Sequence, residues 1–319
     1  MRAKAFLAIL TLAVVFSSGI AQATVPIQTV VAFDPNAEEF PEGAAVAKTD
    51  TVYVSLINPI AEIRQIDPSD GSQSVLTHFD VPGFGPLGLA TTASGDLYVD
   101  VASFDPATQG VYVVQPDGTS ERLPGTEGMQ FPNGVALDKR GNVYATDSIG
   151  GSVWRIPRGG GTGEIWFQDP LLEGTGSLGL GFPIGANGIA FHQNAIIVAN
   201  TEGQRIVRIP VRPDGSAGTP SVLADSPQLF GADGIALAVS GNIYVAVNPQ
   251  STLLRLTSDG SITTLATAAD GLQNPASLAF GAGKGDRKSL FLTNFATFSA
   301  TPTPALLEAD VGEPGLPLP

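Results

Sequence analysis

Pro132-Asn133-Gly134-Val135-Ala136-Leu137 opens a unit that recurs along the chain. Each copy starts with Pro or Ala and continues into a short apolar stretch. The six openings are Pro41-Glu42-Gly43, Pro86-Leu87-Gly88, Pro132-Asn133-Gly134, Ala186-Asn187-Gly188, Ala232-Asp233-Gly234 and Pro275-Ala276-Ser277. They follow one another at intervals of 43 to 54 residues, a period that is typical of solenoids and propellers.

The unit that begins at Pro132 shows the internal pattern most clearly. Apolar stretches at 135–137, 143–146, 152–156 and 164–167 predict four short strands. Gly141 and Asn142 separate the first two, and such residues supply the positive φ that tight hairpins need. Four antiparallel strands repeated radially form a blade of a β-propeller.

The two ends of the chain indicate how the ring closes. The last unit offers only three strands, at 275–280, 289–294 and 305–311, whereas the apolar stretch 27–33 precedes the first unit. This stretch can complete the last blade and remove an exposed strand edge. We therefore predict an all-β fold, a six-bladed β-propeller closed by an N-terminal strand, in a single domain that covers residues 24–319.

Residues 1–23 have the features of a signal peptide. Arg2 and Lys4 are followed by the apolar stretch 5–16 and by Ala21-Gln22-Ala23, a small-residue cleavage pattern. No second long hydrophobic segment follows, so no membrane span is expected in the mature form. The predicted location is secreted or periplasmic. The chain has no cysteine, so stability has to come from a large core rather than from disulfides.

The charge balance bears on the partners. The formal net charge is −14, which repels nucleic acid and raises the local concentration of cations. We therefore expect a small-molecule substrate and no nucleic-acid partner, while the sequence says nothing of a protein partner.

The second residues of the openings are the candidate site. In a propeller the innermost strands line the tunnel, so these side chains meet at one mouth. Glu42 and Asp233 supply two carboxylates, and Asn133 and Asn187 supply two neutral amides. Oxygen ligands of these kinds suit Ca²⁺ and leave positions for water or substrate. Alternatively, Asn-Gly and Asp-Gly are ordinary turn pairs that only lead into each strand.

These openings, in this order and each on its own blade, resemble the calcium site of the senescence marker protein/gluconolactonase/regucalcin family, with a more distant likeness to diisopropyl fluorophosphatase and the paraoxonases. The resemblance covers the whole predicted mature chain. It implies calcium-dependent hydrolysis of lactones or related esters, with the substrate oxygen bound to calcium. Two departures concern the substrate: Phe131 stands where sugar-lactone members carry arginine, and Leu87 stands where paraoxonases carry histidine.

Catalytic roles are assigned as hypotheses. Asp233 is the first candidate for general base or nucleophile and Glu42 the second, and both could equally be ligands only. Leu87, Phe131 and Phe182 are expected to make the pocket apolar, with the long loop 171–185 acting as a flap. Polar residues at the ends of second strands, namely Asp147, Asn200 and Asn294, are expected near the same mouth, where they could contact substrate or support the following loops.

Two other functions fit the same sequence. A non-catalytic propeller could bind a ligand or protein with calcium in a structural role, since fold does not settle function. A lyase similar to strictosidine synthase would use a glutamate near the mouth and would not need the metal.

Overall fold

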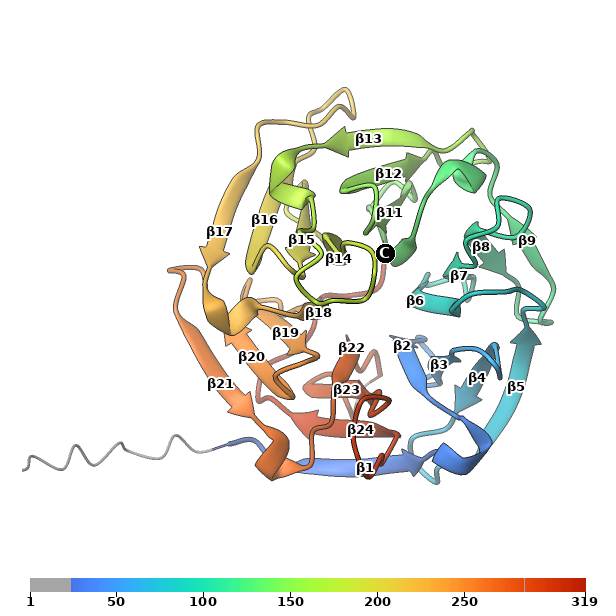
Figure 1. The fold of residues 1–319 in the computed structure, drawn as a ribbon, viewed down its shortest axis with the longest axis vertical. Coiled ribbons are helices and arrows are strands. Elements are labelled where there is room, and N and C mark those ends of the chain that lie inside the picture. Colours follow the sequence, from blue (N-terminus) through green and yellow to red (C-terminus); the bar gives the residue numbers. More distant parts are fainter. Residues whose placement is uncertain (1–23, 284) are drawn as a thin grey trace, which may run out of the picture.

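The chain forms a ring of six four-stranded antiparallel sheets around a central tunnel (Figure 1). A computed structural model describes residues 24–283 and 285–319, so the predicted signal peptide lies outside the described residues. The predicted six-bladed β-propeller is confirmed. Within the described ranges, no helix has the length and hydrophobicity to cross a membrane.

Each of the first five blades is built from consecutive strands, which follow the chain from the tunnel outward. Blade one contains β2 (Pro41–Val46), β3 (Val52–Leu56), β4 (Glu62–Ile66) and β5 (Gln73–His78). Blade two contains β6 (Gly85–Thr91), β7 (Leu97–Ala102), β8 (Gly110–Val114) and β9 (Ser120–Arg122). Blade three contains β10 (Pro132–Leu137), β11 (Val143–Asp147), β12 (Ser152–Ile156) and β13 (Glu164–Gln168).

The remaining blades have the same order. Blade four contains β14 (Ala186–His192), β15 (Ala195–Asn200), β16 (Arg205–Pro210) and β17 (Ser221–Asp225). Blade five contains β18 (Ala232–Leu237), β19 (Ile243–Val247), β20 (Thr252–Leu256) and β21 (Ile262–Ala266). Short 3₁₀ helices lie between the blades, at η1 (Pro35–Ala37), η2 (Thr126–Gly128), η3 (Pro170–Leu172), η4 (Pro227–Leu229) and η5 (Ala268–Asp270).

Blade six joins the two ends of the chain. It contains β22 (Pro275–Phe280), β23 (Ser289–Asn294) and β24 (Ala305–Asp310), and β1 (Ile27–Ala32) adds the outermost strand. β1 pairs with β24 in antiparallel register from Ile27 opposite Ala309 to Ala32 opposite Ala305. The expectation that an N-terminal strand closes the ring is therefore confirmed.

The glycine of each of the first five openings reflects close packing around the tunnel. A Cβ atom at Gly188 would collide with the backbone oxygen of Asp233 in the next blade, and one at Gly134 would meet the backbone oxygen of Asn187. The pairing register also shifts at this point in every inner strand, for example between Pro132 and Val135. Such bulges re-aim side chains, so the residue before the glycine faces the tunnel mouth.

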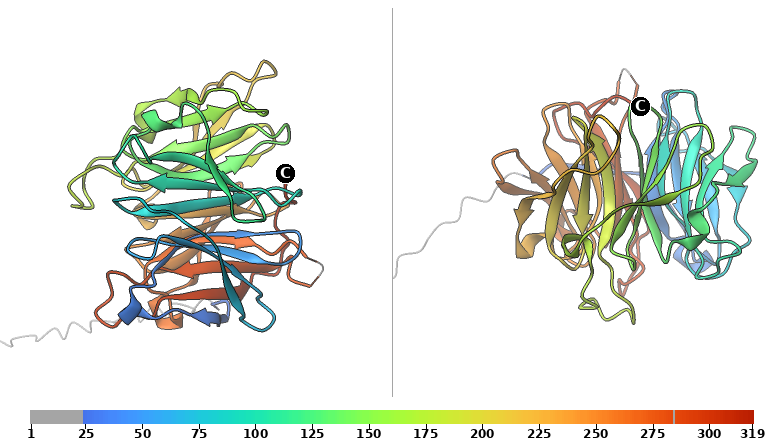
Figure 2. Two further views of the ribbon diagram at one scale, coloured as in Figure 1. Left: turned by 90° about the vertical axis from the view of Figure 1, so that its right-hand side faces the viewer. Right: turned by 90° about the horizontal axis from the view of Figure 1, so that it is seen from above.

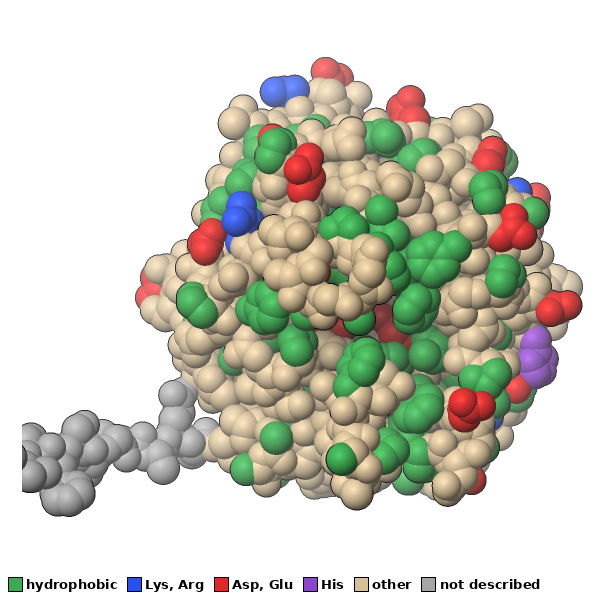
Figure 3. Space-filling model, in the orientation of Figure 1, with side chains coloured by type: hydrophobic (Ala, Val, Ile, Leu, Met, Phe, Trp, Pro, Cys, Tyr) green, Lys and Arg blue, Asp and Glu red, His purple; other side chains and the backbone are tan. Residues whose placement is uncertain are grey.

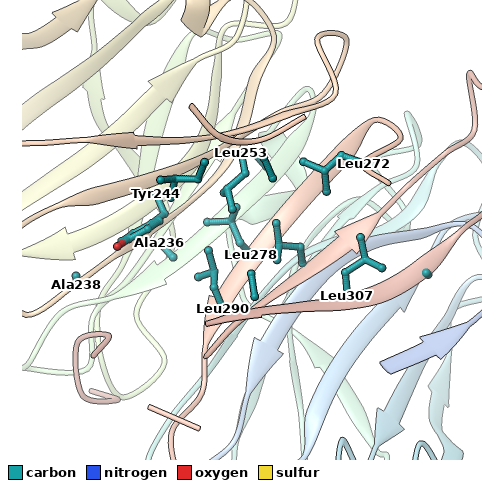
Figure 4. Packing of buried hydrophobic residues seen from close by; sticks show 14 residues of the cluster. Ala236, Ala238, Tyr244, Leu253, Leu272, Leu278, Leu290 and Leu307 are labelled. Carbon is teal, nitrogen blue, oxygen red and sulfur yellow. The ribbon is translucent and has the colours of Figure 1, made fainter. Parts of the chain in front are cut away.

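Apolar side chains fill the spaces between neighbouring blades. Between blades five and six, Tyr244 and Leu253 pack with Leu278, Leu290 and Leu307 (Figure 4). Sandwiching the blades in this way fixes the distance from each inner strand to its neighbours, so the mouth residues are held on a stiff frame.

The two faces of the ring differ. The loop 173–185 protrudes from one face, and the C-terminus lies on the other (Figure 2). The segment 311–319 is held at the far ends of the inner strands, since Val239 donates its backbone N–H to Pro314 and Leu316 donates to Leu237. The face with the loop is the one that carries the candidate site.

Candidate functional site

A cavity of about 460 Å³ opens at the tunnel mouth. All four predicted ligand residues, Glu42, Asn133, Asn187 and Asp233, line it, as does Leu87. Figure 3 shows acidic side chains at the bottom of the central hollow with hydrophobic side chains around it. The ring therefore brings together on one surface the side chains that the repeat predicts to meet.

Hydrogen bonds fix the orientation of the Asn133 amide. Its Nδ2 donates to Ser148 Oγ at 3.0 Å, while the hydroxyl of Ser148 donates to the backbone oxygen of Ala186 at 2.6 Å. Because that hydroxyl proton is already committed, Ser148 can only accept from Asn133. The NH₂ group of Asn133 therefore faces Ser148, and its Oδ1 is left for the cavity.

Asn187 is oriented in the same way one blade further on. Its Nδ2 donates to Thr201 Oγ1 at 3.0 Å, and Thr201 donates to the backbone oxygen of Ala232 at 2.7 Å. Ser148 and Thr201 each directly follow the second strand of their blade, β11 and β15. The two amides thus present an oxygen to the cavity for the same structural reason.

Asp233 is half-buried and lies beside two amide side chains. Asn248 Nδ2 donates to Asp233 Oδ2 at 3.3 Å and also to the backbone oxygen of Asn274 at 3.2 Å. Burial raises the pKa of Asp233 to about 7, although hydrogen bonds from Asn187 and Asn248 oppose the shift. Without a cation, this carboxyl group therefore keeps its proton to a higher pH than an exposed aspartic acid does.

The surroundings of Glu42 disfavour its ionised form. Burial, followed by the charges of Asp233 and Asp100, raises its pKa well above the ordinary value. Its Oε2 is buried and has no hydrogen-bond partner among the described residues. A buried, unpaired carboxylate is costly unless a positive charge accompanies it. The site therefore has the electrostatic character of a cation site.

The cavity wall above these polar residues is apolar and largely aromatic. Phe84, Phe131 and Phe182 pack edge to face or tilted, with ring centroids 5.5 Å apart for Phe84–Phe131 and for Phe131–Phe182. Phe295 and Phe298 line the cavity as well. The polar lining residues are Glu42, Asn133, Asn187, Thr201, Asp233, Asn248 and Asn274. A ligand would therefore meet polar groups at the base and hydrocarbon around the rest.

One buried carboxylate anchors the loop that covers the mouth. Glu202 accepts hydrogen bonds from the backbone N–H groups of Thr175, Gly176 and Leu178 at 2.5 to 2.9 Å. The same loop carries Leu178, Leu180 and Phe182 into the cavity wall. Because Glu202 directly follows Thr201, a single turn after β15 both orients Asn187 and holds the loop.

The expected pocket residues fall into two groups. Leu87, Phe131 and Phe182 line the cavity as expected, whereas Asp147, Asn200 and Asn294 do not. Their side chains support loop backbone instead: Asp147 accepts from Gln130, Phe131 and Gly150, Asn200 bonds Leu171, Glu173 and Gly203, and Asn294 bonds Gly271, Gln273 and Thr303. The expectation that these three side chains line the substrate pocket is therefore wrong.

The residues that do reach the predicted ligands lie one position later. Ser148, Thr201 and Asn248 follow directly after β11, β15 and β19, and sequence reasoning gave no role to Ser148 or Thr201. In the sequence, the available signal was a pair of adjacent polar residues at the end of a second strand. The pairing register of that strand decides which residue of the pair faces the mouth. Within the described ranges, no three His, Cys, Asp or Glu side chains gather as a metal cluster. The candidate site instead combines two carboxylates with two amides.

Part of the chain, including two of the four mouth residues, matches a known protein family. The family model described as the SMP-30/Gluconolactonase/LRE-like region matches residues 183–296. This segment is similar to the region that the family model describes. It covers about a third of the chain and includes Asn187 and Asp233. The resemblance predicted from the repeat openings is thereby confirmed, while no protein of curated function matches the sequence significantly.

Solved structures agree with the fold over nearly the whole chain. The calcium-binding protein regucalcin from Agrobacterium tumefaciens is 18% identical, with 93% of this chain and 98% of that chain covered and a TM-score of 0.68. A gluconolactonase from Xanthomonas campestris is 18% identical over 95% and 99%, with a TM-score of 0.64. A luciferin-regenerating enzyme is 14% identical over 92% and 98%, with a TM-score of 0.69. At these identities the likeness establishes the fold.

Proposed function

We propose that this protein is a calcium-dependent hydrolase of lactones or related esters whose substrate carries an apolar portion. The observation that carries the proposal is the convergence of Glu42, Asp233, Asn133 and Asn187 on one cavity. The SMP-30/gluconolactonase/LRE-like region at 183–296 supports the same reaction class.

The residues present fit a hard dication. Glu42 and Asp233 together offer two negative charges, and the orphaned Oε2 of Glu42 is a buried acceptor with no donor in the described chain. The Oδ1 atoms of Asn133 and Asn187 would add ligands without adding charge. When bound, Ca²⁺ polarises a carbonyl group and stabilises the negative charge that develops on its oxygen during acyl transfer.

Side chains of the protein would then accept the proton and position the substrate. Asp233 is our candidate for the group that accepts a proton from the attacking water or attacks directly, because it lies in the cavity and its neighbours Asn187 and Asn248 hold it in place. A cation beside it would lower its pKa. Whether Asp233 acts as base, nucleophile or ligand alone is what its substitution has to distinguish.

The apolar wall narrows the substrate class. A polyhydroxylated sugar lactone needs partners for several hydroxyl groups, and the upper wall offers Phe84, Phe131, Phe182 and Leu180 instead. A lactone or ester with an acyl chain or aromatic ring would bury that group against this wall, at roughly 25 cal/mol per Å² of apolar surface.

The test is a metal analysis of the purified protein combined with a panel of short-chain, long-chain and aromatic lactones and esters. We expect turnover that chelator abolishes and calcium restores, and that favours apolar substrates. Glu42→Gln and Asp233→Asn should lose this turnover while circular dichroism still reports the folded ring. Full activity in both variants would overturn the proposed site.

The same measurements separate the alternatives. A non-catalytic propeller would be stabilised by calcium but would hydrolyse none of the panel. A lyase that needs no metal would show no thermal shift on calcium addition and no loss of its activity with chelator.

A further inference from the structure

Blade five binds a carboxylate on the face opposite the mouth. The carboxylate belongs to Glu313, which lies in the C-terminal segment far from blade five in sequence. Tyr244 Oη donates to Glu313 Oε1 at 2.6 Å, Asn242 Nδ2 donates to the same oxygen at 2.8 Å, and Ser240 Oγ donates to Oε2. The C-terminal segment is thus fastened to blade five through one acidic side chain.

The surroundings of Glu313 favour its ionised form. Burial favours the neutral acid, yet the hydrogen bonds from Ser240, Tyr244 and Asn242 and the charge of Arg255 outweigh it and lower the pKa of Glu313. Arg255 faces Tyr244 across the β19–β20 pair. A tyrosine and an asparagine that donate hydrogen bonds, and an arginine that adds positive charge, are therefore three parts of this carboxylate receptor, and Ser240 adds a further donor.

Blade three contains the same three residues in the same register. Tyr144 pairs with Arg155 across β11 and β12, as Tyr244 pairs with Arg255 across β19 and β20. Asn142 precedes Tyr144 by two positions, as Asn242 precedes Tyr244. The other four blades lack this combination of residues at these positions.

The receptor of blade three has no carboxylate at its tyrosine. Tyr144 is fully buried, and its Oη has no hydrogen-bond partner among the described residues. Burial raises the pKa of Tyr144, so this hydroxyl keeps its proton and remains a donor. A buried donor without an acceptor destabilises the protein, and an arriving acceptor would remove that cost.

The acid nearest to Tyr144 is already engaged. Asp138 Oδ1 accepts from the backbone N–H groups of Arg140 and Asn142, and Asp138 Oδ2 accepts from Asn142 Nδ2 at 2.7 Å. Neither oxygen makes a hydrogen bond to Tyr144. Asp138 therefore replaces Glu313 only as the acceptor for Asn142, and the hydroxyl of Tyr144 is left without an acceptor among the described residues.

The surroundings of Tyr144 favour an anion. A cavity of about 300 Å³ is lined by Tyr144, Arg155, Lys139, Arg140 and Arg212, with Asp138 as its only acidic residue. Four basic residues against one acidic residue form a local positive field in a chain whose net charge is −14. Such a field attracts and holds negatively charged ligands.

We infer that the blade-three cavity binds a carboxylate group supplied from outside the chain, with Tyr144 Oη donating to it and Arg155 beside it. The ligand is a carboxylate-bearing small molecule or an acidic side chain of a peptide segment, and Glu313 in blade five is its internal precedent. This inference concerns the face opposite the mouth and does not depend on the proposed hydrolase function.

Two probes distinguish the sources of the carboxylate. One is glutarate, and the other is a capped peptide with the sequence of residues 312–315, Gly-Glu-Pro-Gly. We expect saturable, salt-sensitive binding in the millimolar range or tighter by calorimetry, with no binding of glutaramide or of the Gln-containing peptide. Binding of glutarate would show that a carboxylate suffices, and binding of the peptide alone would identify an acidic segment as the ligand.

Matched variants test the assignment to blade three. Tyr144→Phe should weaken carboxylate binding by about tenfold or more without lowering the stability of the free protein, because its hydroxyl has no partner to lose. Tyr244→Phe should leave binding unchanged and lower stability, since it breaks the bond to Glu313. Absence of carboxylate binding in the wild-type protein, equal binding of the uncharged probes, or full binding by Tyr144→Phe would overturn the inference.

Discussion

Thr201 holds the side-chain amide of Asn187 by accepting from Nδ2 at 3.0 Å while giving its own proton to the backbone oxygen of Ala232. One hydroxyl therefore decides which atom of Asn187 faces the cavity. Ser148 does the same for Asn133. If the amide oxygens bind calcium, these hydroxyls control the affinity of a site that they do not themselves complete.

We predict that Thr201→Val weakens calcium binding by about tenfold to a hundredfold, because supporting hydrogen bonds of this kind typically contribute that much to metal affinity. Thr201→Ser keeps the hydroxyl and should bind calcium like the wild type. Calorimetric titration of the chelator-treated proteins measures both. An unchanged dissociation constant in a folded Thr201→Val variant would show that the orientation of Asn187 does not govern the site.

Asp100 occupies a position where three other blades place a hydroxyl. Thr146 Oγ1 accepts from the backbone N–H of Gly134 at 2.8 Å and donates to the backbone oxygen of Asn187 at 2.7 Å, and Ser55 and Thr293 make the equivalent pair of bonds. Asp100 has the same register, because Val101 lies opposite Pro86 as Asp147 lies opposite Pro132. Yet both of its carboxylate oxygens are buried without a hydrogen-bond partner in the described chain.

We therefore predict that Asp100→Thr raises the free energy of unfolding by about 1–3 kcal/mol, because it replaces an unsatisfied buried carboxylate by a group that can bridge two blades. Urea denaturation at neutral pH with chelator present measures the change. Thr146→Asp is the reciprocal control and should destabilise. A lower midpoint for Asp100→Thr would mean that the carboxylate has a compensating partner outside the described residues.

The fold could be predicted from the sequence because five of the six openings repeat the same physical requirement, a glycine at the third position, where the sixth has Ser277. A glycine is needed where a Cβ at Gly188 would strike the backbone of Asp233, and the residue before it is thereby aimed at the tunnel. This also explains why Asn-Gly and Asp-Gly here are not ordinary turns. The four mouth residues followed from that rule without further information.

The supporting residues could not be predicted in the same way. Asp147 and Ser148 are adjacent polar residues at a strand end, and only the pairing of Asp147 with Pro132 shows that Asp147 supports a loop while Ser148 faces the mouth. Asp100 looks in sequence like another strand end, although its register is that of Thr146. The partnership of Tyr244 with Glu313 spans 69 positions, beyond the reach of any local pattern.

The site should make stability depend on pH when calcium is absent. The pKa of Asp233 rises on folding from 3.8 to about 7, and that of Glu42 rises well above 4.5. For an acid with a raised pKa the folded state binds more protons than the unfolded state, so stability falls as pH rises through this window. We predict that the chelator-treated protein is more stable at about pH 5 than at about pH 7.5 with respect to these two groups.

Calcium should reverse that trend, because the dication binds the ionised carboxylates and stabilises the folded state by mass action. The increase in melting temperature on calcium addition is therefore expected to grow from about pH 5 to about pH 7.5. The double variant Glu42→Gln with Asp233→Asn is the control and should lose the calcium effect and the part of the slope that these two groups contribute, while buried Asp100, whose pKa is also raised, keeps its own part. An equal increase in melting temperature at both pH values would show that calcium does not bind at these two carboxylates.

Glu202 should set the preference of the pocket for apolar substrates. Its carboxylate accepts hydrogen bonds from three backbone N–H groups of the loop that bears Leu178 and Phe182. Glu202→Gln keeps the size of the side chain but gives up the charge and replaces one acceptor oxygen by a donor, which weakens hydrogen bonds that are worth about 1.5–3 kcal/mol each when charged. The loop should then hold its apolar residues over the cavity for a smaller fraction of the time.

We predict that Glu202→Gln raises KM for long-chain or aromatic esters by about threefold to tenfold, with a much smaller effect on kcat and on short-chain substrates, because the polar base of the cavity is untouched. Glu173→Gln, in the same loop but exposed, is the matched control and should behave like the wild type. Steady-state kinetics over a series of chain lengths gives the comparison. Equal loss on short and long substrates would instead show that Glu202 supports Asn187 through Thr201, because both depend on the turn after β15.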